Sequence, residues 1–88
     1  MKLNESFVLR QVSGTWVVLP LGEESVDFNG MLTLNESGAM LWKVLEQGGG
    51  REELLAALMA EYRVEQDVAS TDVDAFLEVL TQVGCIEE

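Results

Sequence analysis

The chain has 88 residues, of which 48% are hydrophobic and 24% are charged, a composition typical of one small folded domain. Sixteen Asp and Glu residues outnumber five Lys and Arg, so the net charge is −11 at pH 7. Nucleic-acid binding needs Lys and Arg contacts with phosphate, so this charge argues against a nucleic-acid partner. No apolar run approaches the ~20 residues of a membrane span and no signal peptide is recognisable, so we expect a cytoplasmic protein without membrane contact.

Residues suited to catalysis or metal binding are few. The chain has one cysteine, Cys85, and no histidine, which excludes a Cys/His catalytic pair and a Cys/His metal site. Cys85 has the apolar neighbours Val83 and Ile86, so we expect it to be a small buried hydrophobe. Asp67 and Asp74 have the seven-residue spacing of one helix face, but two carboxylates do not make a firm metal site. We therefore expect no enzyme activity, no metal and no cofactor.

The first half of the chain predicts a β-sheet. Phe7 to Val12 and Thr15 to Leu19 are apolar and partly β-branched, and Ser13-Gly14 between them suits a two-residue hairpin turn in which Gly takes positive φ. Pro20 cannot donate to a sheet ladder, so it ends the second strand or takes an unpaired position. Gly30 to Leu34 predicts a third, short strand.

Two helices follow the predicted sheet. Asn35 suits the N-cap of the first helix, with Glu36 in the first turn at its positive end. Three glycines, Gly48-Gly49-Gly50, stop this helix and form a loop. The second helix is predicted from about Arg51 to Tyr62, although glycines stand where a Ser, Thr or Asp cap would be more usual.

A third helix is predicted from about Glu65 to Val83. It has a neighbouring stripe that is only partly apolar and a wide apolar face for the core, formed by Ala69, Val73, Phe76, Leu77, Leu80 and Val83. Ser70 or Thr71 could instead cap a shorter helix. The order of elements predicts a single α+β domain over residues 1–88, in a winged-helix-like arrangement. A three-stranded antiparallel sheet comes first and three helices follow.

The run from Phe28 to Trp42, FNGMLTLNESGAMLW, resembles the segment around the third strand and first helix of PqqD-like proteins. These are recognition domains for the precursors of ribosomally synthesised, post-translationally modified peptides. Similar features follow at matching places, so the resemblance covers nearly the whole chain: Glu52-Glu53-Leu54, Tyr62-Arg63-Val64, Asp72-Val73, Phe76-Leu77, Leu80 and Gly84-Cys85-Ile86.

The resemblance implies that a leader peptide adds a strand to the exposed edge of the third strand and packs against the third helix. The residues expected to bind the peptide are Met31, Leu32, Thr33 and Leu34 on the strand and Val68, Asp72, Ala75 and Val79 on the partly apolar stripe of the helix. Ala75 is small enough to leave room for an incoming side chain. The alternative is that the apolar members only fill the core, a role that we favour for Leu34 and assign outright to Trp42.

The resemblance also implies partners. The domain would present the precursor peptide to a separate modifying enzyme, such as a radical SAM enzyme with an iron–sulfur cluster, and would be a monomer or a weak dimer. A winged-helix transcription regulator is one alternative, disfavoured because the third helix lacks Lys and Arg. A structural or oligomerising subunit that pairs its own strand edge is the other.

Overall fold

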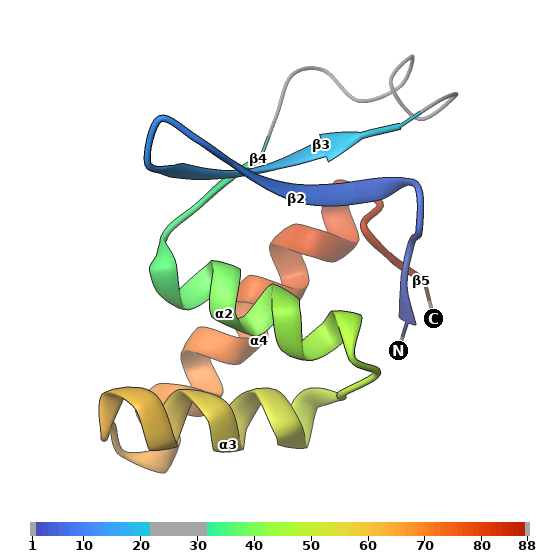
Figure 1. Cartoon of the computed structure of the whole chain (residues 1–88). Helices are drawn as coiled ribbons and strands as arrows, with labels where there is room; N and C mark the ends of the chain where they lie inside the picture. Colours follow the sequence, from blue (N-terminus) through green and yellow to red (C-terminus); the bar gives the residue numbers. More distant parts are fainter. Residues whose placement is uncertain (1, 22–31, 88) are drawn as a thin grey trace.

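The computed structural model describes residues 2–21 and 32–87. Within these ranges the helices lie together on one side of the sheet (Figure 1). The predicted α+β fold, a three-stranded antiparallel sheet followed by three helices, is confirmed. The elements in chain order are β1 (Lys2–Leu3), β2 (Phe7–Val12), β3 (Thr15–Pro20), β4 (Leu32–Leu34), α2 (Glu36–Glu46), α3 (Arg51–Tyr62), α4 (Gln66–Gln82) and β5 (Ile86–Glu87).

The three-stranded sheet has the order β2-β3-β4, and its neighbouring strands are antiparallel. Ser13 and Gly14 have φ values of 51° and 80°, as a two-residue turn with both central residues at positive φ requires. The hairpin prediction is therefore confirmed, and β3 ends at Pro20. In the predicted third strand, Gly30 and Met31 lie outside the described residues, and Leu32–Leu34 form β4.

A second sheet joins the two ends of the chain and was not predicted. β1 pairs with β5 in antiparallel register, Leu3 opposite Ile86. Next to this pair, the Asn4 backbone N–H donates to the Cys85 carbonyl at 2.7 Å. Strands of two residues carry no readable alternation of apolar and polar side chains, so sequence patterning does not detect them.

The starts of α2 and α3 are stabilised by side chains. The Asn35 Oδ1 atom accepts a hydrogen bond of 2.8 Å from the Gly38 N–H, which confirms Asn35 as the N-cap of α2. At α3 the cap residue is Gly50, and the Glu53 carboxylate accepts a hydrogen bond of 2.7 Å from its N–H. Glu53 therefore satisfies a backbone donor at a helix start that lacks a capping side chain.

The helix α4 begins at Gln66. Its first backbone hydrogen bond runs from the Ala69 N–H to the Glu65 carbonyl at 2.9 Å. The alternative of a shorter helix capped by Ser70 or Thr71 is therefore wrong. None of the helices in the described ranges is long and apolar enough to cross a membrane.

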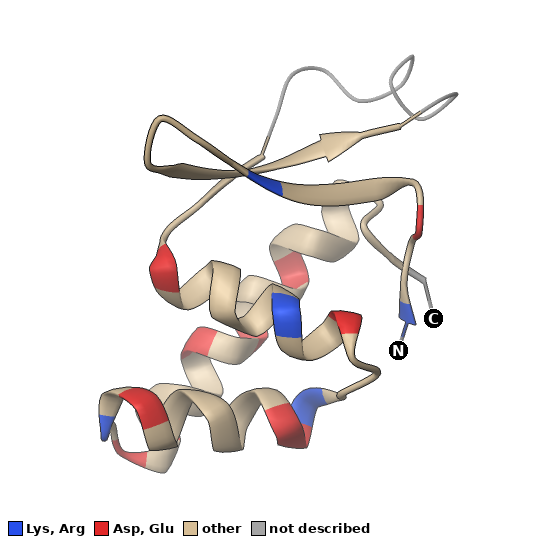
Figure 2. Cartoon of the chain, viewed as in Figure 1, with Lys and Arg blue, Asp and Glu red and all other residues tan. Residues whose placement is uncertain are grey.

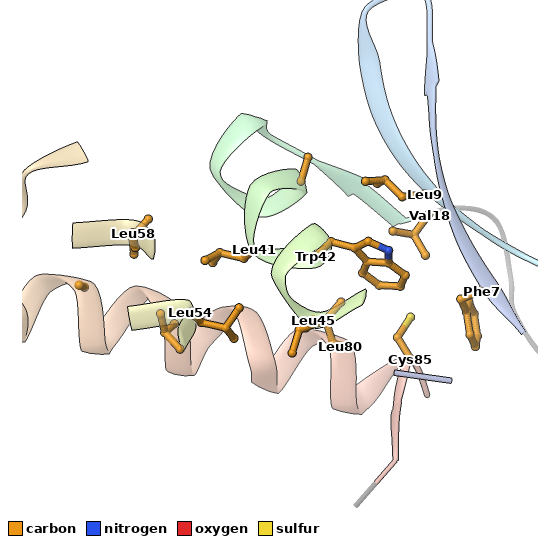
Figure 3. Close-up of a cluster of buried hydrophobic side chains, with 13 residues drawn as sticks. Phe7, Leu9, Val18, Leu41, Trp42, Leu45, Leu54, Leu58, Leu80 and Cys85 are labelled. Carbon is orange, nitrogen blue, oxygen red and sulfur yellow. The ribbon is translucent and has the colours of Figure 1, made fainter. Parts of the chain in front are cut away.

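The core lies between the sheet and the helices, with Trp42 of α2 at its centre (Figure 3). Trp42 is 1% exposed and Cys85 is 0% exposed, which confirms both as core residues. Figure 3 shows Leu9 and Val18 of the sheet on one side of the Trp42 ring and Cys85 on the other. The buried cluster is completed by Phe7, Ala39, Leu41, Leu45, Leu54, Leu58, Ala69, Val73 and Leu80.

Candidate functional site

A groove runs between β4 and α4. Its part beside β4, which we name the strand hollow, has a volume of 280 Å³. The strand hollow is lined by Leu32, Thr33, Leu34, Asn35, Gly38, Ala75, Phe76 and Val79.

The groove continues between α2, α3 and α4 as a second space of 290 Å³, which we name the helix hollow. This hollow is lined by Asn35, Ser37, Gly38, Leu41, Leu58, Asp72, Ala75 and Phe76. Because the two hollows share Asn35, Gly38, Ala75 and Phe76, they form one continuous depression, the β4–α4 groove.

The strand β4 supplies one wall of the groove and its hydrogen-bonding groups. Within the described residues, β4 is the last strand of its sheet and pairs only with β3, Val17 lying opposite Thr33. Neither proline nor a charged side chain interrupts Leu32–Leu34. The outer edge of β4 is therefore suited to pair with a further strand.

The helix α4 supplies the opposite wall. Asp72 and Ala75 are exposed, and Val79 is 42% exposed. Val68 belongs to the same stripe and is 46% exposed. The alternative in which Val68 and Val79 only fill the core is therefore wrong, because both side chains face solvent.

The structure brings together six of the eight residues that the sequence assigned to peptide binding: Leu32, Thr33, Leu34, Asp72, Ala75 and Val79. Val68 lines neither hollow and lies one turn before Asp72 on α4. Met31 lies outside the described residues. Leu34 combines two roles, because it lines the strand hollow and is also packed against the core cluster.

Six further lining residues were not predicted to bind peptide: Asn35, Ser37, Gly38, Leu41, Leu58 and Phe76, of which Leu41 and Leu58 are buried in the core. Phe76 was assigned to the core face of α4, but it is only half-buried and lines both hollows. Asn35 was predicted only as the N-cap of α2, and Ser37 and Gly38 lie in the first turn of that helix. The position of Asn35 directly after β4 was the available signal, because the first turn of α2 must then adjoin the strand edge.

Gly38 allows the first turn of α2 to approach β4 closely. A Cβ atom at this position would lie 3.3 Å from the Leu34 Cβ and 3.2 Å from the Asn35 Oδ1, closer than ordinary van der Waals contact. The Asn35 Oδ1 atom also accepts a hydrogen bond of 2.9 Å from the Ser37 hydroxyl. These contacts fix the shape of the groove where β4 passes into α2.

Two aspartates of α4, Asp74 and Asp72, differ in whether they form an ion pair. The Arg51 guanidinium donates to the Asp74 carboxylate from Nε at 2.8 Å, and it also reaches the Ser70 hydroxyl at 2.6 Å. The hydrogen bond from Arg51 holds the pKa of Asp74 below its ordinary value. Asp72 forms no ion pair with any described residue.

Groups for covalent or metal chemistry are not gathered in the groove. Across residues 2–21 and 32–87, no three Cys, Asp or Glu side chains are placed to hold a metal ion. Burial raises the pKa of the Cys85 thiol to about 11, so the reactive thiolate is disfavoured. The groove offers a strand edge, an apolar surface and a carboxylate, which are features of a ligand-binding site.

A larger hollow of 420 Å³ lies elsewhere, around β1 and the C-terminal part of α2. Its lining includes Leu3, Phe7 and Leu45, and the residues predicted to bind peptide are absent from its described lining. The β4–α4 groove is therefore the candidate functional site.

Comparisons with solved structures agree with this fold. The chain is similar to the protein in the structure "TbiB1 in Complex with the TbiA(beta) Leader Peptide", with a TM-score of 0.81 and 28% sequence identity, over 99% of this chain and 95% of that chain. It also has the fold of the protein in "Lasso peptide synthetase B1 complexed with the leader peptide", with a TM-score of 0.73 and 23% identity, over 92% of this chain and 89% of that chain.

A search of curated proteins finds no match. The family model described as "Coenzyme PQQ synthesis protein D (PqqD)" matches residues 15–86, which include β3, β4 and all three described helices. The chain belongs to the PqqD family.

Proposed function

We propose that the chain binds the leader segment of a ribosomally made precursor peptide in the β4–α4 groove and presents it to a separate modifying enzyme. The observation that carries the proposal is the continuous groove between an open strand edge and the exposed stripe of α4. The 28% identical neighbour was solved with a leader peptide, which supports the same ligand class here.

Binding would use the backbone and the side chains of the groove for different purposes. The leader would extend the sheet by pairing with Leu32–Leu34, and these backbone hydrogen bonds depend little on the peptide sequence. Selectivity would come from leader side chains that enter the strand hollow beside Val79 and the helix hollow beside Ala75.

The proposal assigns no catalytic step to this chain. The chemistry belongs to a partner enzyme, for which a radical SAM enzyme is one candidate class. Precursor peptides are made by ribosomes, so their recognition is proposed to occur in the cytoplasm. We propose that residues 1–88 act as one domain, as a monomer or a weak dimer.

The two alternative functions are less well supported. DNA binding by a winged-helix fold needs a basic recognition element, and α4, Gln66–Gln82, contains no Lys or Arg. Self-association through β4 would occupy the same strand edge as the peptide. Added leader peptide would then dissociate the oligomer, which size-exclusion chromatography can measure.

A substitution in the groove tests the proposal. The ligand to be tested is the leader of any short precursor peptide that a neighbouring gene encodes, labelled with a fluorophore and titrated by fluorescence anisotropy. The Ala75→Trp variant should lose at least about 10-fold in affinity, because the indole fills the space shared by the two hollows. The matched control is Ala60→Trp, at an exposed position of α3 that lines neither hollow.

Circular dichroism distinguishes a blocked groove from an unfolded domain. Both variants should keep the wild-type helical signal and cooperative thermal unfolding. Equal affinity of Ala75→Trp and wild type for the leader would overturn the proposal, as would equal losses in Ala75→Trp and Ala60→Trp.

A further inference from the structure

The helix hollow combines an apolar floor with one charge. Leu41 and Leu58 are 3% and 4% exposed, and Phe76 is half-buried beside them. Among the described residues that line the whole groove, Asp72 alone carries a charge. A side chain that enters this hollow would therefore meet hydrocarbon below and a carboxylate at the exposed wall.

The Asp72 carboxylate is available to a ligand. Asp72 has no ion-pair partner among the described residues, where the one recorded ion pair joins Arg51 to Asp74. An apolar ligand side chain over Asp72 would remove water from the carboxylate without replacing its hydrogen bonds, which costs free energy. A cationic side chain would supply those hydrogen bonds.

The surroundings favour a cation as well. Between Arg51 and Gln82 the chain has eight Asp and Glu residues and two Arg residues. Figure 2 shows acidic positions along α3 and α4 and basic positions at the two ends of α3. The N-terminal end of α2, where the helix dipole is positive, adjoins the hollow. The negative charge of Glu36 in the first turn offsets this positive potential, and Asn35 caps the helix.

We infer that the helix hollow is a subsite for a Lys or Arg side chain of the bound peptide. The aliphatic stem lies on Leu41, Leu58 and Phe76, and the charged head meets Asp72 near solvent, as long basic side chains do on mixed surfaces. The inference rests on the proposed function, because a peptide in the groove must deliver the side chain. It adds a specificity that backbone pairing with β4 cannot provide.

A peptide selection tests this subsite with a ligand set that is independent of the natural leader. The probe is a phage-displayed library of random 20-residue peptides, selected in parallel on the wild-type chain and on the Asp72→Lys and Glu78→Lys variants. Glu78 is exposed on α4, lines neither hollow and gives the same change of net charge. It is therefore the matched control, and circular dichroism checks that both variants are folded.

Peptides selected on the wild type should carry Lys or Arg at one aligned position, about tenfold above its frequency in the library. Selection on Asp72→Lys should remove this preference and favour Asp or Glu at the same position, because the sign of the wall charge is reversed. Selection on Glu78→Lys should retain the Lys or Arg preference.

Two results would overturn the subsite while the proposed function stands. The first is a set of groove-binding peptides without a basic position. The second is a basic preference that Glu78→Lys removes as completely as Asp72→Lys, since the preference would then reflect net charge alone. If the selected peptides bind Ala75→Trp as tightly as wild type, the groove is not the binding site, and the proposed function fails together with the subsite.

Discussion

Small side chains keep the β4–α4 groove open. Ala75 stands at the junction of the strand and helix hollows, and Gly38 lets α2 approach Leu34 where a Cβ atom would be crowded. Phe76 lines both hollows and forms part of the floor of the groove. The volume available to a ligand side chain is therefore set by a few positions, and the proposed loss of affinity in Ala75→Trp follows from this geometry.

Cys85 provides a prediction at the residue scale that concerns reactivity. Because burial raises the thiol pKa to about 11, alkylation by iodoacetamide at pH 8 should be at least about 100-fold slower in the folded chain than after unfolding in guanidinium. Mass spectrometry of timed samples measures both rates. Rapid alkylation of the folded chain would contradict the core position of Cys85.

Residue roles could be predicted from sequence where one physical property decides them. Cys85 was assigned to the core because its neighbours Val83 and Ile86 are apolar, and Trp42 because it shares a helix face with Leu41 and Leu45. Phe76 was assigned to the core from helical periodicity. Periodicity shows that a residue lies on the apolar face of a helix, but it does not show whether that part of the face is buried or lines a groove. Recognition of its role required the position of β4, because only the packing of the strand beside α4 shows where the apolar face remains open.

The helices that frame the groove are linked by Arg51 and Asp74. Their side chains join the first turn of α3 to the middle of α4 through a bidentate pair, with Nε and a terminal guanidinium nitrogen 2.8 and 3.1 Å from the two carboxylate oxygens. Both side chains are partly exposed, so solvent screens their attraction. The contribution of the pair to folding is therefore small, although it links α3 to the helix that carries Asp72 and Ala75.

The ion pair predicts a pH dependence of stability. Its hydrogen bond lowers the pKa of Asp74 below the ordinary 3.8. A carboxyl group with a depressed pKa in the folded state stabilises the fold above its unfolded pKa, and the stabilisation is lost as the pH falls through the folded pKa. The free energy of unfolding of wild type should therefore exceed that of Asp74→Asn at pH 7, and the difference should shrink below about pH 4.

Urea unfolding from pH 7 to pH 2.5 measures this difference. Glu78→Gln is the control, because within residues 2–21 and 32–87 the Glu78 carboxylate accepts one long hydrogen bond, of 3.4 Å from Gln82. A gap between wild type and Asp74→Asn that stays constant with pH would contradict the prediction. The same result in Glu78→Gln and Asp74→Asn would also contradict it.

Most elements could be predicted from the sequence. The hairpin, α2 and α3 were predicted with nearly correct bounds, because turn residues, an N-cap and glycines mark their ends. The start of α4 was ambiguous, since Ser70 and Thr71 are good caps in isolation. In the folded chain both lie inside the helix, where Thr71 donates to the Asp67 carbonyl, and packing of Ala69 and Val73 in the core extends the helix to Gln66.

The whole molecule carries a net charge of −11, which affects how any partner approaches. If a basic residue of the leader meets Asp72, binding should weaken as salt screens the attraction. The dissociation constant should rise about 3- to 10-fold between 50 and 500 mM NaCl in anisotropy titrations. The Asp72→Asn variant should show a smaller rise, and Glu78→Gln should resemble wild type.

An affinity that is independent of salt would indicate that the leader is held by backbone pairing and apolar contacts alone. That result would contradict the proposed contact between a basic leader residue and Asp72, and the β4–α4 groove would remain the proposed binding site.

Pairing of a leader peptide with β4 and its packing against α4 are tested most directly by nuclear magnetic resonance. Isotope-labelled protein is titrated with the leader of any short precursor peptide that a neighbouring gene encodes, and the backbone amide shifts are mapped on the structure. We predict the largest shifts at Leu32–Leu34 and from Asp72 to Val79, on the two walls of the groove. Shifts confined to the hairpin of β2 and β3, or no shifts at saturating peptide, would contradict the account.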